Sequence, residues 1–277
     1  MHTEVSETGR YERTLTIQLE EAELGFDARV RGMLMHRCLE LFWNEVRSSD
    51  RLLSLGEQGR RALVSGCIDQ AFGENRRDPG LEQGYLELER SRLQRLLMRW
   101  LETIELQRAP FTVVGLEEDI EMELEGLALT LRADRIDTLE DGRQIVIDYK
   151  SGRPFTPDWE SERPGEPQLP LYTLSNKRQT AGALLAFING RETRFSGLVE
   201  EKSLVPGNNS LFYKGDWDAL LAQWKTSLHA LAAEVMQGYV AIDPVDPARS
   251  CRYCGLQSLC RIDESASEFQ PEEKDDS

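Results

Sequence analysis

The strongest constraint on the fold is a change in the sequence pattern at Phe111. Before this residue, apolar side chains recur mostly every three or four positions, which is typical of amphipathic helices. After it, apolar and polar residues alternate, as they do in strands with two different faces. Residues 127–137 and 144–150 are two such runs, and Asp141-Gly142 between them is a strong signal for a hairpin turn. The chain therefore has to combine a helical block with an antiparallel pair of strands.

The same patterns predict the other elements. We expect helices over residues 27–46, 60–71, 81–106, 166–175 and 216–238. We expect further strands over residues 111–124, 182–188 and 193–199. The first of these is either one strand or two strands joined by a bend, and Asn189-Gly190 predicts a second hairpin turn. Because strands and helices do not alternate regularly, we predict an α/β fold with a mixed central sheet flanked by helices and an N-terminal helical layer.

The charge of the chain is strongly negative and unevenly distributed. With 49 acidic and 33 basic side chains, the net charge is −16, which excludes nucleic-acid binding through bulk charge alone. Residues 1–25 hold six acids and two bases, and residues 261–277 hold seven acids and two bases. A local basic groove is therefore compatible with the region between them. We predict an acidic N-terminal extension over 1–25, a folded domain over 26–260 and a disordered acidic tail over 261–277.

Cysteine usage and apolar runs limit the location of the protein. No apolar run approaches the roughly 18 residues of a membrane helix, and the acidic first residues lack the apolar stretch of a secretory signal. We therefore expect a cytoplasmic protein without a membrane partner. Five cysteines are too few for a secreted disulfide scaffold, but Cys251, Cys254 and Cys260 form C-x2-C-x5-C. That spacing suits thiolates that converge on one metal ion or cluster.

Charged residues on the predicted hairpin are the main candidates for chemistry. Asp148 and Lys150 are two positions apart on one strand, so their side chains point to the same face. Asp134 on the partner strand can approach that face. Two carboxylates repel each other and are costly to bury, and a divalent cation such as Mg²⁺ resolves the repulsion. Lys150 could then orient or deprotonate a water and stabilise charge on a phosphate. The alternative is an ordinary ion pair on an exposed sheet face.

Five short motifs occur in one order along the chain. They are Gly32-Met33-Leu34-Met35-His36, Asp134-Arg135-Ile136-Asp137, Asp148-Tyr149-Lys150-Ser151-Gly152, Gln168-Leu169-Pro170-Leu171-Tyr172 and the cysteine motif. In this combination and order, the sequence resembles the PD-(D/E)XK nuclease superfamily, and within it the RecB/AddB-like exonuclease branch. The resemblance implies a restriction-endonuclease-like core over residues 26–260 that includes a C-terminal cysteine segment, 251–260.

The resemblance also implies roles for single residues. The implied catalytic residues are Asp134, Asp148, Lys150, Gln168 and Tyr172. The implied metal ligands are His36, Asp134, Asp148 and the backbone carbonyl of Tyr149. Lys150 would be the catalytic lysine, while Gln168 and Tyr172, spaced i and i+4 on one helix, would lie beside the site. Glu118 is a further acidic candidate. Without the resemblance, His36 on an apolar-striped helix would be interpreted as a structural histidine.

The cysteine motif departs from the family pattern. In the family, three C-terminal cysteines join one cysteine upstream of the G-x-x-x-H helix to hold a four-iron four-sulfur cluster. Residues 1–31 contain no cysteine. Cys38 and Cys67 are the candidates for the fourth ligand, although their apolar neighbours also suit buried small side chains. Zn²⁺ is the alternative to iron and sulfur, and a purely structural staple is a third interpretation.

The predicted function is metal-dependent DNA hydrolysis. The resemblance implies an exonuclease that uses Mg²⁺ or Mn²⁺ on single-stranded or unwound DNA in recombinational repair, with a helicase partner that delivers the strand. The alternative is a catalytically silent, nuclease-like scaffold or interaction subunit of a repair complex. The complete set of Asp134, Asp148 and Lys150 favours the enzyme, because a decayed site would be expected to lose one of them.

Overall fold

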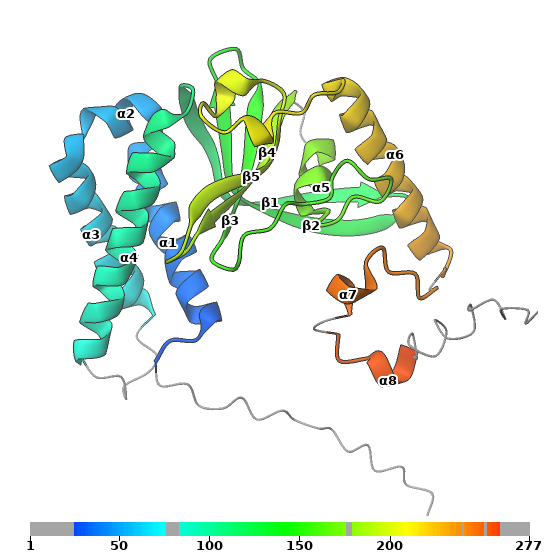
Figure 1. Ribbon diagram of the computed structural model, residues 1–277, viewed down its shortest axis with the longest axis horizontal. Coiled ribbons are helices and arrows are strands. Elements are labelled where there is room, and N and C mark those ends of the chain that lie inside the picture. Colours follow the sequence, from blue (N-terminus) through cyan, green and yellow to red (C-terminus); the bar gives the residue numbers. More distant parts are fainter. Residues whose placement is uncertain (1–24, 76–82, 176–178, 240, 252–253, 261–277) are drawn as a thin grey trace, which may run out of the picture.

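Five strands form the sheet that organises the molecule in a computed structural model, which describes residues 25–75, 83–175, 179–239, 241–251 and 254–260. The strands are β1 (Phe111–Leu124), β2 (Leu127–Leu139), β3 (Gln144–Lys150), β4 (Thr180–Ile188) and β5 (Thr193–Val199). They lie in the order β1-β2-β3-β4-β5 (Figure 1). The predicted tail and nearly all of the predicted N-terminal extension lie outside the described residues.

The sheet is mixed, as the sequence predicts. β3 and β4 are parallel, whereas the other neighbouring strands pair antiparallel. Both predicted hairpins are present, with Gly142 at φ +87° in the first turn. In the second turn, the Asn189 side chain accepts hydrogen bonds from the backbone N–H groups of Arg191 and Glu192. Residues 111–124 form one strand with a bulge between Val113 and Gly115, which is the first of the two alternatives.

The helices agree with the predicted periodicity. They are α1 (Ala28–Val46), α2 (Ser49–Ser54), α3 (Gly56–Glu74), α4 (Gln83–Thr103), α5 (Gln168–Ser175), α6 (Trp217–Met236), α7 (Pro247–Ser250) and α8 (Gln257–Cys260), with 3-10 turns η1 (Glu105–Gln107), η2 (Lys202–Leu204) and η3 (Asn209–Leu211). The Asp27 carboxylate caps α1 by accepting a hydrogen bond from the Val30 N–H. The short helix α2 was not predicted, because it buries only Leu52 and so carries no apolar period. No described helix has the length and apolarity needed to cross a membrane.

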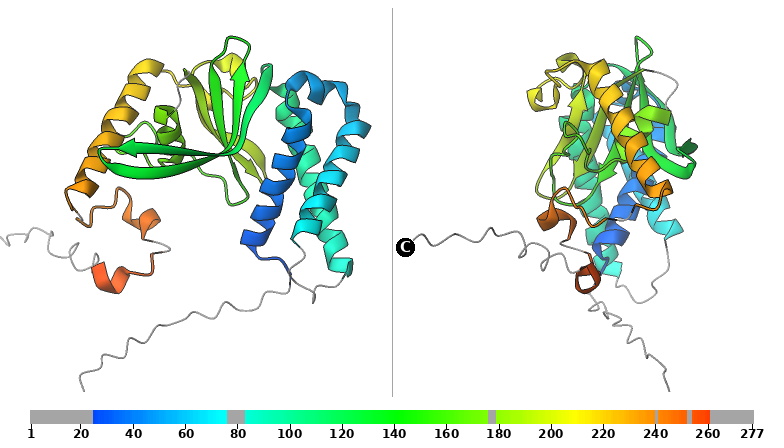
Figure 2. Two further views of the ribbon diagram at one scale, coloured as in Figure 1. Left: turned by 180° about the vertical axis from the view of Figure 1, so that it is seen from behind. Right: turned by 90° about the vertical axis from the view of Figure 1, so that its right-hand side faces the viewer.

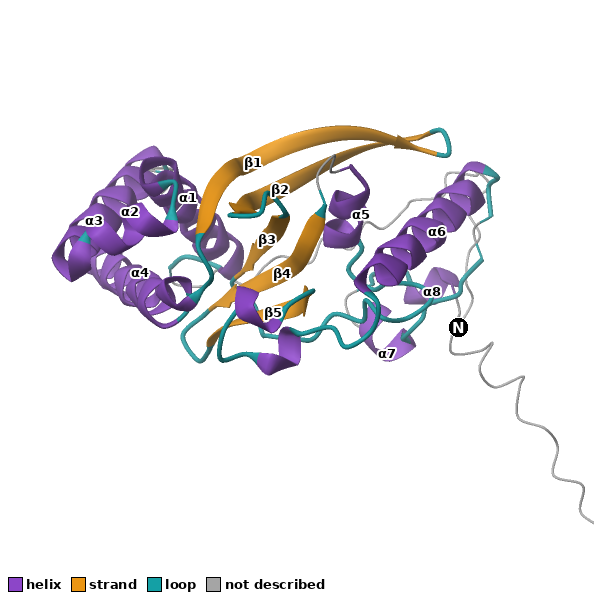
Figure 3. Cartoon of the chain, turned by 90° about the horizontal axis from the view of Figure 1, so that it is seen from above, coloured by secondary structure: helices purple, strands orange, loops and turns teal. Residues whose placement is uncertain are grey.

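The sheet is covered on both faces. Helices α1 to α4 pack on one face, and α5 and α6 lie on the other, so three successive layers are seen from above (Figure 3). The view from behind shows the same separation (Figure 2). On β3, Ile145 and Ile147 belong to the core under the helical layer, and Val146 belongs to the core under α5 and α6. This double coverage explains why the strand reads as a continuous apolar run up to Asp148.

The five tryptophans lie in the core on the two faces of the sheet. Trp43, Trp100, Trp159 and Trp224 are at most 1% exposed, and Trp217 is 5% exposed. Trp43 and Trp100 anchor the core beneath the helical layer, whereas the other three belong to the opposite core. A rigid core on each face fixes the strands between them, and the charged residues at the end of β3 take their positions from that framework.

Candidate active site

The hairpin of β2 and β3 places two carboxylates opposite each other. Arg135 pairs with Ile147 in this hairpin, so Asp134 and Asp148 are the next residues along. The backbone N–H of Tyr149 donates a hydrogen bond of 2.6 Å to Asp134 Oδ2. Lys150 Nζ lies 2.7 Å from Asp148 Oδ2. Asp148 and Lys150 therefore share a face, as strand alternation requires.

Helix α1 supplies an imidazole to these strands. His36 Nδ1 lies 3.5 Å from Asp134 Oδ2 and 3.9 Å from Glu117 Oε1. These three side chains are close enough together to hold one metal ion. Gly32, one turn earlier on α1, explains the close approach, because a Cβ at that position would lie only 3.2 Å from Ser151 Oγ. Both fixed residues of the G-x-x-x-H motif thus have a physical role.

The acid that joins Asp134 and Asp148 at this site is Glu117, and not the further candidate Glu118. Glu117 lies between the paired positions Leu116–Arg135 and Glu118–Ala133, which places it opposite Asp134. Its backbone has φ +46°, and the bulge after Val113 shifts the alternation of β1. Simple alternation therefore fails to identify it. The available signal is Gly115, because an isolated glycine within a strand pattern indicates a bulge.

Burial makes the carboxylates of this group interdependent. Asp148 and Asp134 are 3% and 8% exposed. Burial and the charge of Asp134 raise the pKa of Asp148, whereas Lys150 opposes this shift. Burial and Asp134 likewise raise the pKa of Glu117. Burial disfavours the charged form of His36, but its hydrogen bond to Asp134 and the charge of Asp134 raise the pKa of the imidazole. Three carboxylates are thus concentrated beside the imidazole and two cations, Lys150 at Asp148 and Arg132 at Glu117.

One buried oxygen in this cluster, Asp148 Oδ2, is held by an ion pair with Lys150. Lys150 Nζ lies 2.7 Å away, and among the described residues this oxygen has no further hydrogen-bond partner. A buried carboxylate oxygen with an unused lone pair suits a hard cation. The donor set of one imidazole and two carboxylates, with Asp148 beside it, thus fits a divalent metal ion.

Gln168 and Tyr172 brace the strands that carry these acids. Gln168 Nε2 donates to the backbone carbonyl of Arg132 at 3.0 Å, and the Tyr172 hydroxyl donates to the carbonyl of Glu118 at 2.9 Å. Both side chains project from α5, where the i and i+4 positions share a face. The structure therefore directs their hydrogen bonds to the backbone of β1 and β2 rather than to the carboxylates.

A fully buried network of charges fixes the opposite side of the same strands. Arg135 lies between Glu105 and Asp137, with closest contacts of 2.8 and 2.6 Å. Arg108 contacts the same two acids at 3.0 and 2.7 Å. Arg135 also donates to the Tyr149 hydroxyl at 3.2 Å. Two guanidinium groups balance two carboxylates here. The network connects η1 to β2 and to Tyr149 of β3, which lies between Asp148 and Lys150.

The cysteine residues occupy two separate environments. Cys251, Cys254 and Cys260 are partly buried around α7 and α8. Within the part of the chain that the structure describes, they are not grouped closely enough to hold a metal ion. Cys38 and Cys67 are buried in the helical layer, and burial raises the pKa of Cys67 to about 11. A protonated, buried thiol is a poor candidate for the fourth ligand.

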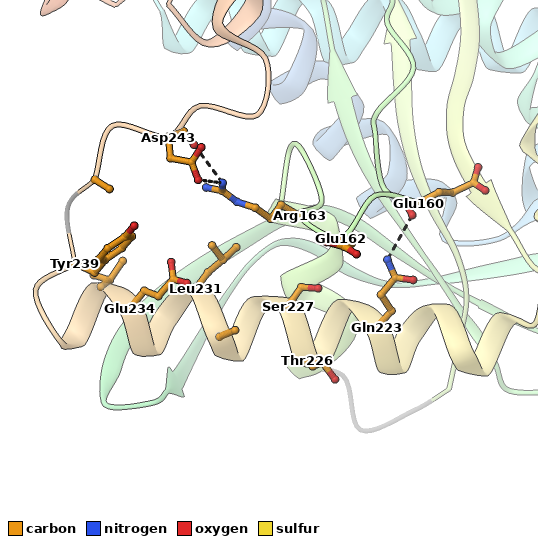
Figure 4. A pocket seen from close by; sticks show the side chains of 13 residues that line it. Glu160, Glu162, Arg163, Gln223, Thr226, Ser227, Leu231, Glu234, Tyr239 and Asp243 are labelled. Atoms are coloured by element: carbon orange, nitrogen blue, oxygen red, sulfur yellow. Dashed lines mark hydrogen bonds and ion pairs between the residues drawn. The ribbon is translucent and has the colours of Figure 1, made fainter. Parts of the chain in front are cut away.

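A larger pocket lies elsewhere on the molecule. It has a volume of about 1070 Å³ and is formed by α6, the loop before α5 and the segment after α6 (Figure 4). Its charged lining residues are Glu160, Glu162, Arg163, Glu234 and Asp243. Arg163 is paired with Asp243 at 2.8 Å. None of the catalytic candidates lines this pocket, and its excess of carboxylates opposes the entry of a phosphate.

Comparisons with known proteins identify one family. A family model described as the PD-(D/E)XK nuclease superfamily matches residues 9–261. A comparison with the curated proteins found no match. Among solved structures, the chain is similar to the protein of "Crystal structure of SSO0001". The two are 16% identical over 81% of this chain and 84% of that one, with a TM-score of 0.28. At that TM-score, the similarity to the solved structure carries no argument about the fold or the site.

Proposed function

The chain belongs to the PD-(D/E)XK nuclease superfamily, and we propose that it is a Mg²⁺-dependent deoxyribonuclease that hydrolyses phosphodiester bonds. The five-stranded mixed sheet flanked by helices agrees with the restriction-endonuclease-like core of that family. The observation that carries the proposal is the convergence of His36, Glu117 and Asp134 beside the Asp148–Lys150 ion pair. Buried carboxylates concentrated in this way suit a divalent cation.

The proposed ligands come from four elements. They are His36 on α1, Glu117 on β1, Asp134 on β2, and Asp148 with the Tyr149 carbonyl on β3. Mg²⁺, or Mn²⁺ in its place, would supply Lewis acidity and an activated water. Asp148 holds Lys150 in place, and the lysine side chain remains 33% exposed. Its ammonium can therefore orient a water and contact a phosphate oxygen as negative charge develops there.

An active enzyme explains the site better than a silent scaffold does. Burying Asp134 and Asp148 together costs stability, as the raised pKa of Asp148 indicates. Nothing in a purely structural role requires that cost. Lys150 adds a cation that reaches the surface from the same face. The full set of groups for metal-assisted hydrolysis therefore supports catalysis over the scaffold alternative.

The finer parts of the proposal rest on motif resemblance and charge. We assign the protein to the RecB/AddB-like branch, as a cytoplasmic exonuclease in recombinational DNA repair that acts on single-stranded or unwound DNA. The net charge of −16 supports a helicase partner, because such a chain attracts free DNA poorly. Linear and circular single strands of one sequence distinguish this assignment, since an exonuclease degrades only the linear form.

A metal cluster at Cys251, Cys254 and Cys260 is a separate proposal. The C-x2-C-x5-C spacing supports either a four-iron four-sulfur cluster or Zn²⁺. The described positions of the three thiols do not form such a site by themselves, and no step of hydrolysis is assigned to it. Visible absorption together with bound iron supports the iron–sulfur cluster, and one bound Zn²⁺ supports the zinc site. If the protein binds neither metal, the segment is a structural staple.

The decisive experiment compares DNA degradation by matched variants. End-labelled single- and double-stranded DNA is incubated with Mg²⁺, Mn²⁺ or EDTA. Asp148→Asn and Lys150→Ala are expected to lose about 100-fold or more of the metal-dependent activity. Asp69→Asn and Lys225→Ala change exposed residues of the same types and should retain it. Metal-dependent cleavage that survives in both site variants, or a folded wild type that cleaves nothing, refutes the proposal.

A further inference from the structure

A small cavity adjoins the candidate active site at the end of β3. It has a volume of about 230 Å³ and lies between α1, α4 and the residues that follow β3 and β4. Its lining includes Met35, which precedes His36, and Ser151, which follows Lys150. Ser151 also lies against Gly32 of α1. Two residues that line the cavity are thus direct sequence neighbours of His36 and Lys150.

The cavity differs in charge from the rest of the molecule. Arg31 and Arg92 line it, and the described lining residues include no acid. Both arginines pair with a single buried carboxylate, Glu89, at 2.9 and 2.8 Å. Two guanidinium groups against one carboxylate leave a net positive charge. Arg31 Nε is also buried without a hydrogen-bond partner, so this side chain retains an unused donor.

Part of the cavity lining is the turn at Asn189 and Gly190, which hydrogen bonds of the Asn189 side chain hold in place. Asn189 Nδ2 donates to the Gly152 carbonyl at 3.0 Å, which joins the segment after β3 to the turn between β4 and β5. The Asn189 side chain also accepts from two backbone N–H groups within that turn. The cavity thus combines two arginines and a polar turn with apolar side chains of Met35, Leu93, Leu96 and Ile188, and this combination suits the phosphate and the less polar parts of a nucleotide.

We infer that this cavity binds one nucleotide of a single DNA strand, with Arg31 and Arg92 holding the phosphate next to the bond that is cleaved. The inference rests on the proposed function and deepens it by naming the strand contact. Guanidinium groups bind phosphate through paired, charge-assisted hydrogen bonds. The volume lies below the roughly 300–1,000 Å³ of pockets for drug-sized ligands. We therefore expect one unit of a strand, rather than a base pair, as its occupant.

Opposite charge changes within the cavity test this inference without catalysis. Binding of a fluorescein-labelled oligo-dT strand is measured in EDTA with the full-length protein. Arg92→Gln and Arg31→Gln each leave the other arginine on Glu89, and each should weaken binding about tenfold. Glu89→Gln removes the carboxylate that pairs with both arginines, and it should tighten binding by about threefold or more. A merely structural role of these residues predicts no improvement.

Controls separate this effect from general charge and folding. Arg61→Gln makes the same charge change at an exposed arginine of α3 that pairs only with Glu57 among the described residues, and its affinity should match that of the wild type. The slope of log affinity against log salt should fall by about 0.7 for each cavity arginine that is removed. Thermal unfolding shows that each variant is folded. Duplex DNA of the same sequence should bind less tightly than the single strand.

The outcomes distinguish this inference from the proposed function. If the wild type cleaves DNA but Arg92→Gln and Arg31→Gln bind like Arg61→Gln, the cavity assignment is wrong and the nuclease stands. Weakened binding by Glu89→Gln also overturns the assignment. If the wild type binds the strand through both arginines but never cleaves it, the cavity stands and the nuclease fails. A wild type that neither binds nor cleaves refutes both.

Discussion

Arg135 is the side chain whose loss should destabilise the fold most clearly. Its guanidinium is fully buried, contacts Glu105 and Asp137, and lies 3.8 Å from the centre of the Trp43 ring. Methionine has a similar length but no charge. Its introduction leaves both carboxylates buried, with Arg108 as the remaining guanidinium group that contacts them. Because an uncompensated buried charge remains, we expect Arg135→Met to cost about 3–5 kcal/mol.

That cost is large compared with the stability of an ordinary domain. A typical free energy of unfolding is about 5–15 kcal/mol. At about 2–4 °C for each kcal/mol, the melting temperature should fall by about 6–20 °C. Arg61→Met is the matched control, because the side chains of Arg61 on α3 and of its partner Glu57 are 55% and 65% exposed. An exposed pair contributes about 0–1 kcal/mol, so this variant should unfold close to the wild type.

Urea unfolding followed by tryptophan fluorescence measures the effect directly. Trp43 lies beneath Arg135, and Trp100 Nε1 donates to Glu105 at 2.9 Å, so both rings report on the network. Arg135→Lys keeps the charge but loses the paired hydrogen bonds, and it provides a milder variant if Arg135→Met does not fold. A loss below about 1 kcal/mol in Arg135→Met, equal to that of Arg61→Met, would show that the buried charges are not coupled.

The effect should also depend on pH. Burial alone would raise the pKa of Glu105, but the charges of Arg135 and Arg108 lower it below its usual value. A lowered pKa in the folded state adds stability above the pKa of the unfolded chain, about 4.3, and this stability is lost as the pH falls. Removing Arg135 removes much of that contribution. The destabilisation should therefore be largest near pH 7 and smaller at pH 4, and an equal loss at both values contradicts the mechanism.

Three further predictions concern the site. Asp148→Asn should raise the melting temperature in EDTA by a few degrees, because it removes a buried charge whose raised pKa reflects burial and repulsion by Asp134; a lower melting temperature argues against repulsion. Mg²⁺ at 100 times its dissociation constant should stabilise the wild type by about 2.7 kcal/mol in calorimetry, and His36→Ala should lose most of this gain at the same concentration. Gly32→Val should reduce metal-dependent activity about tenfold or more, because a Cβ at this position would lie 3.2 Å from Ser151 Oγ. The control Gly66→Val places its Cβ in open space on α3 and should keep the activity. Equal activities of the two variants would refute the packing argument.

The sequence predicts the framework of the candidate site because its signals are local. The Asp141-Gly142 turn fixes the hairpin register, and alternation then places Asp148 and Lys150 on one face. The spacing of Gly32 and His36 places both on one side of α1. Each of these inferences uses neighbours a few positions apart, where the geometry of strands and helices repeats regularly.

The features that the sequence analysis missed depend on irregular backbone or on distant contacts. Glu117 reaches Asp134 because of a bulge and a positive φ, and neither follows from apolar alternation. The same lack of local signal hides Glu105, which meets Arg135 only after η1 packs against β2. Alternation along β2 predicts that Arg135 and Asp137 lie on the opposite face from Asp134. It does not predict which residues Arg135 and Asp137 contact. Long-range pairing of charges needs the assembled structure.

The position of His36 has a consequence for the order of folding. The carboxylates and the lysine come from neighbouring strands, whereas the imidazole comes from a helix far earlier in the sequence. Hairpins close over short loops, but docking a distant helix requires a much longer loop to close, at a greater entropic cost. We therefore expect the strand ligands to assemble first and the imidazole to arrive last. Metal affinity would then rise late during refolding, and a partly folded chain would carry an incomplete centre.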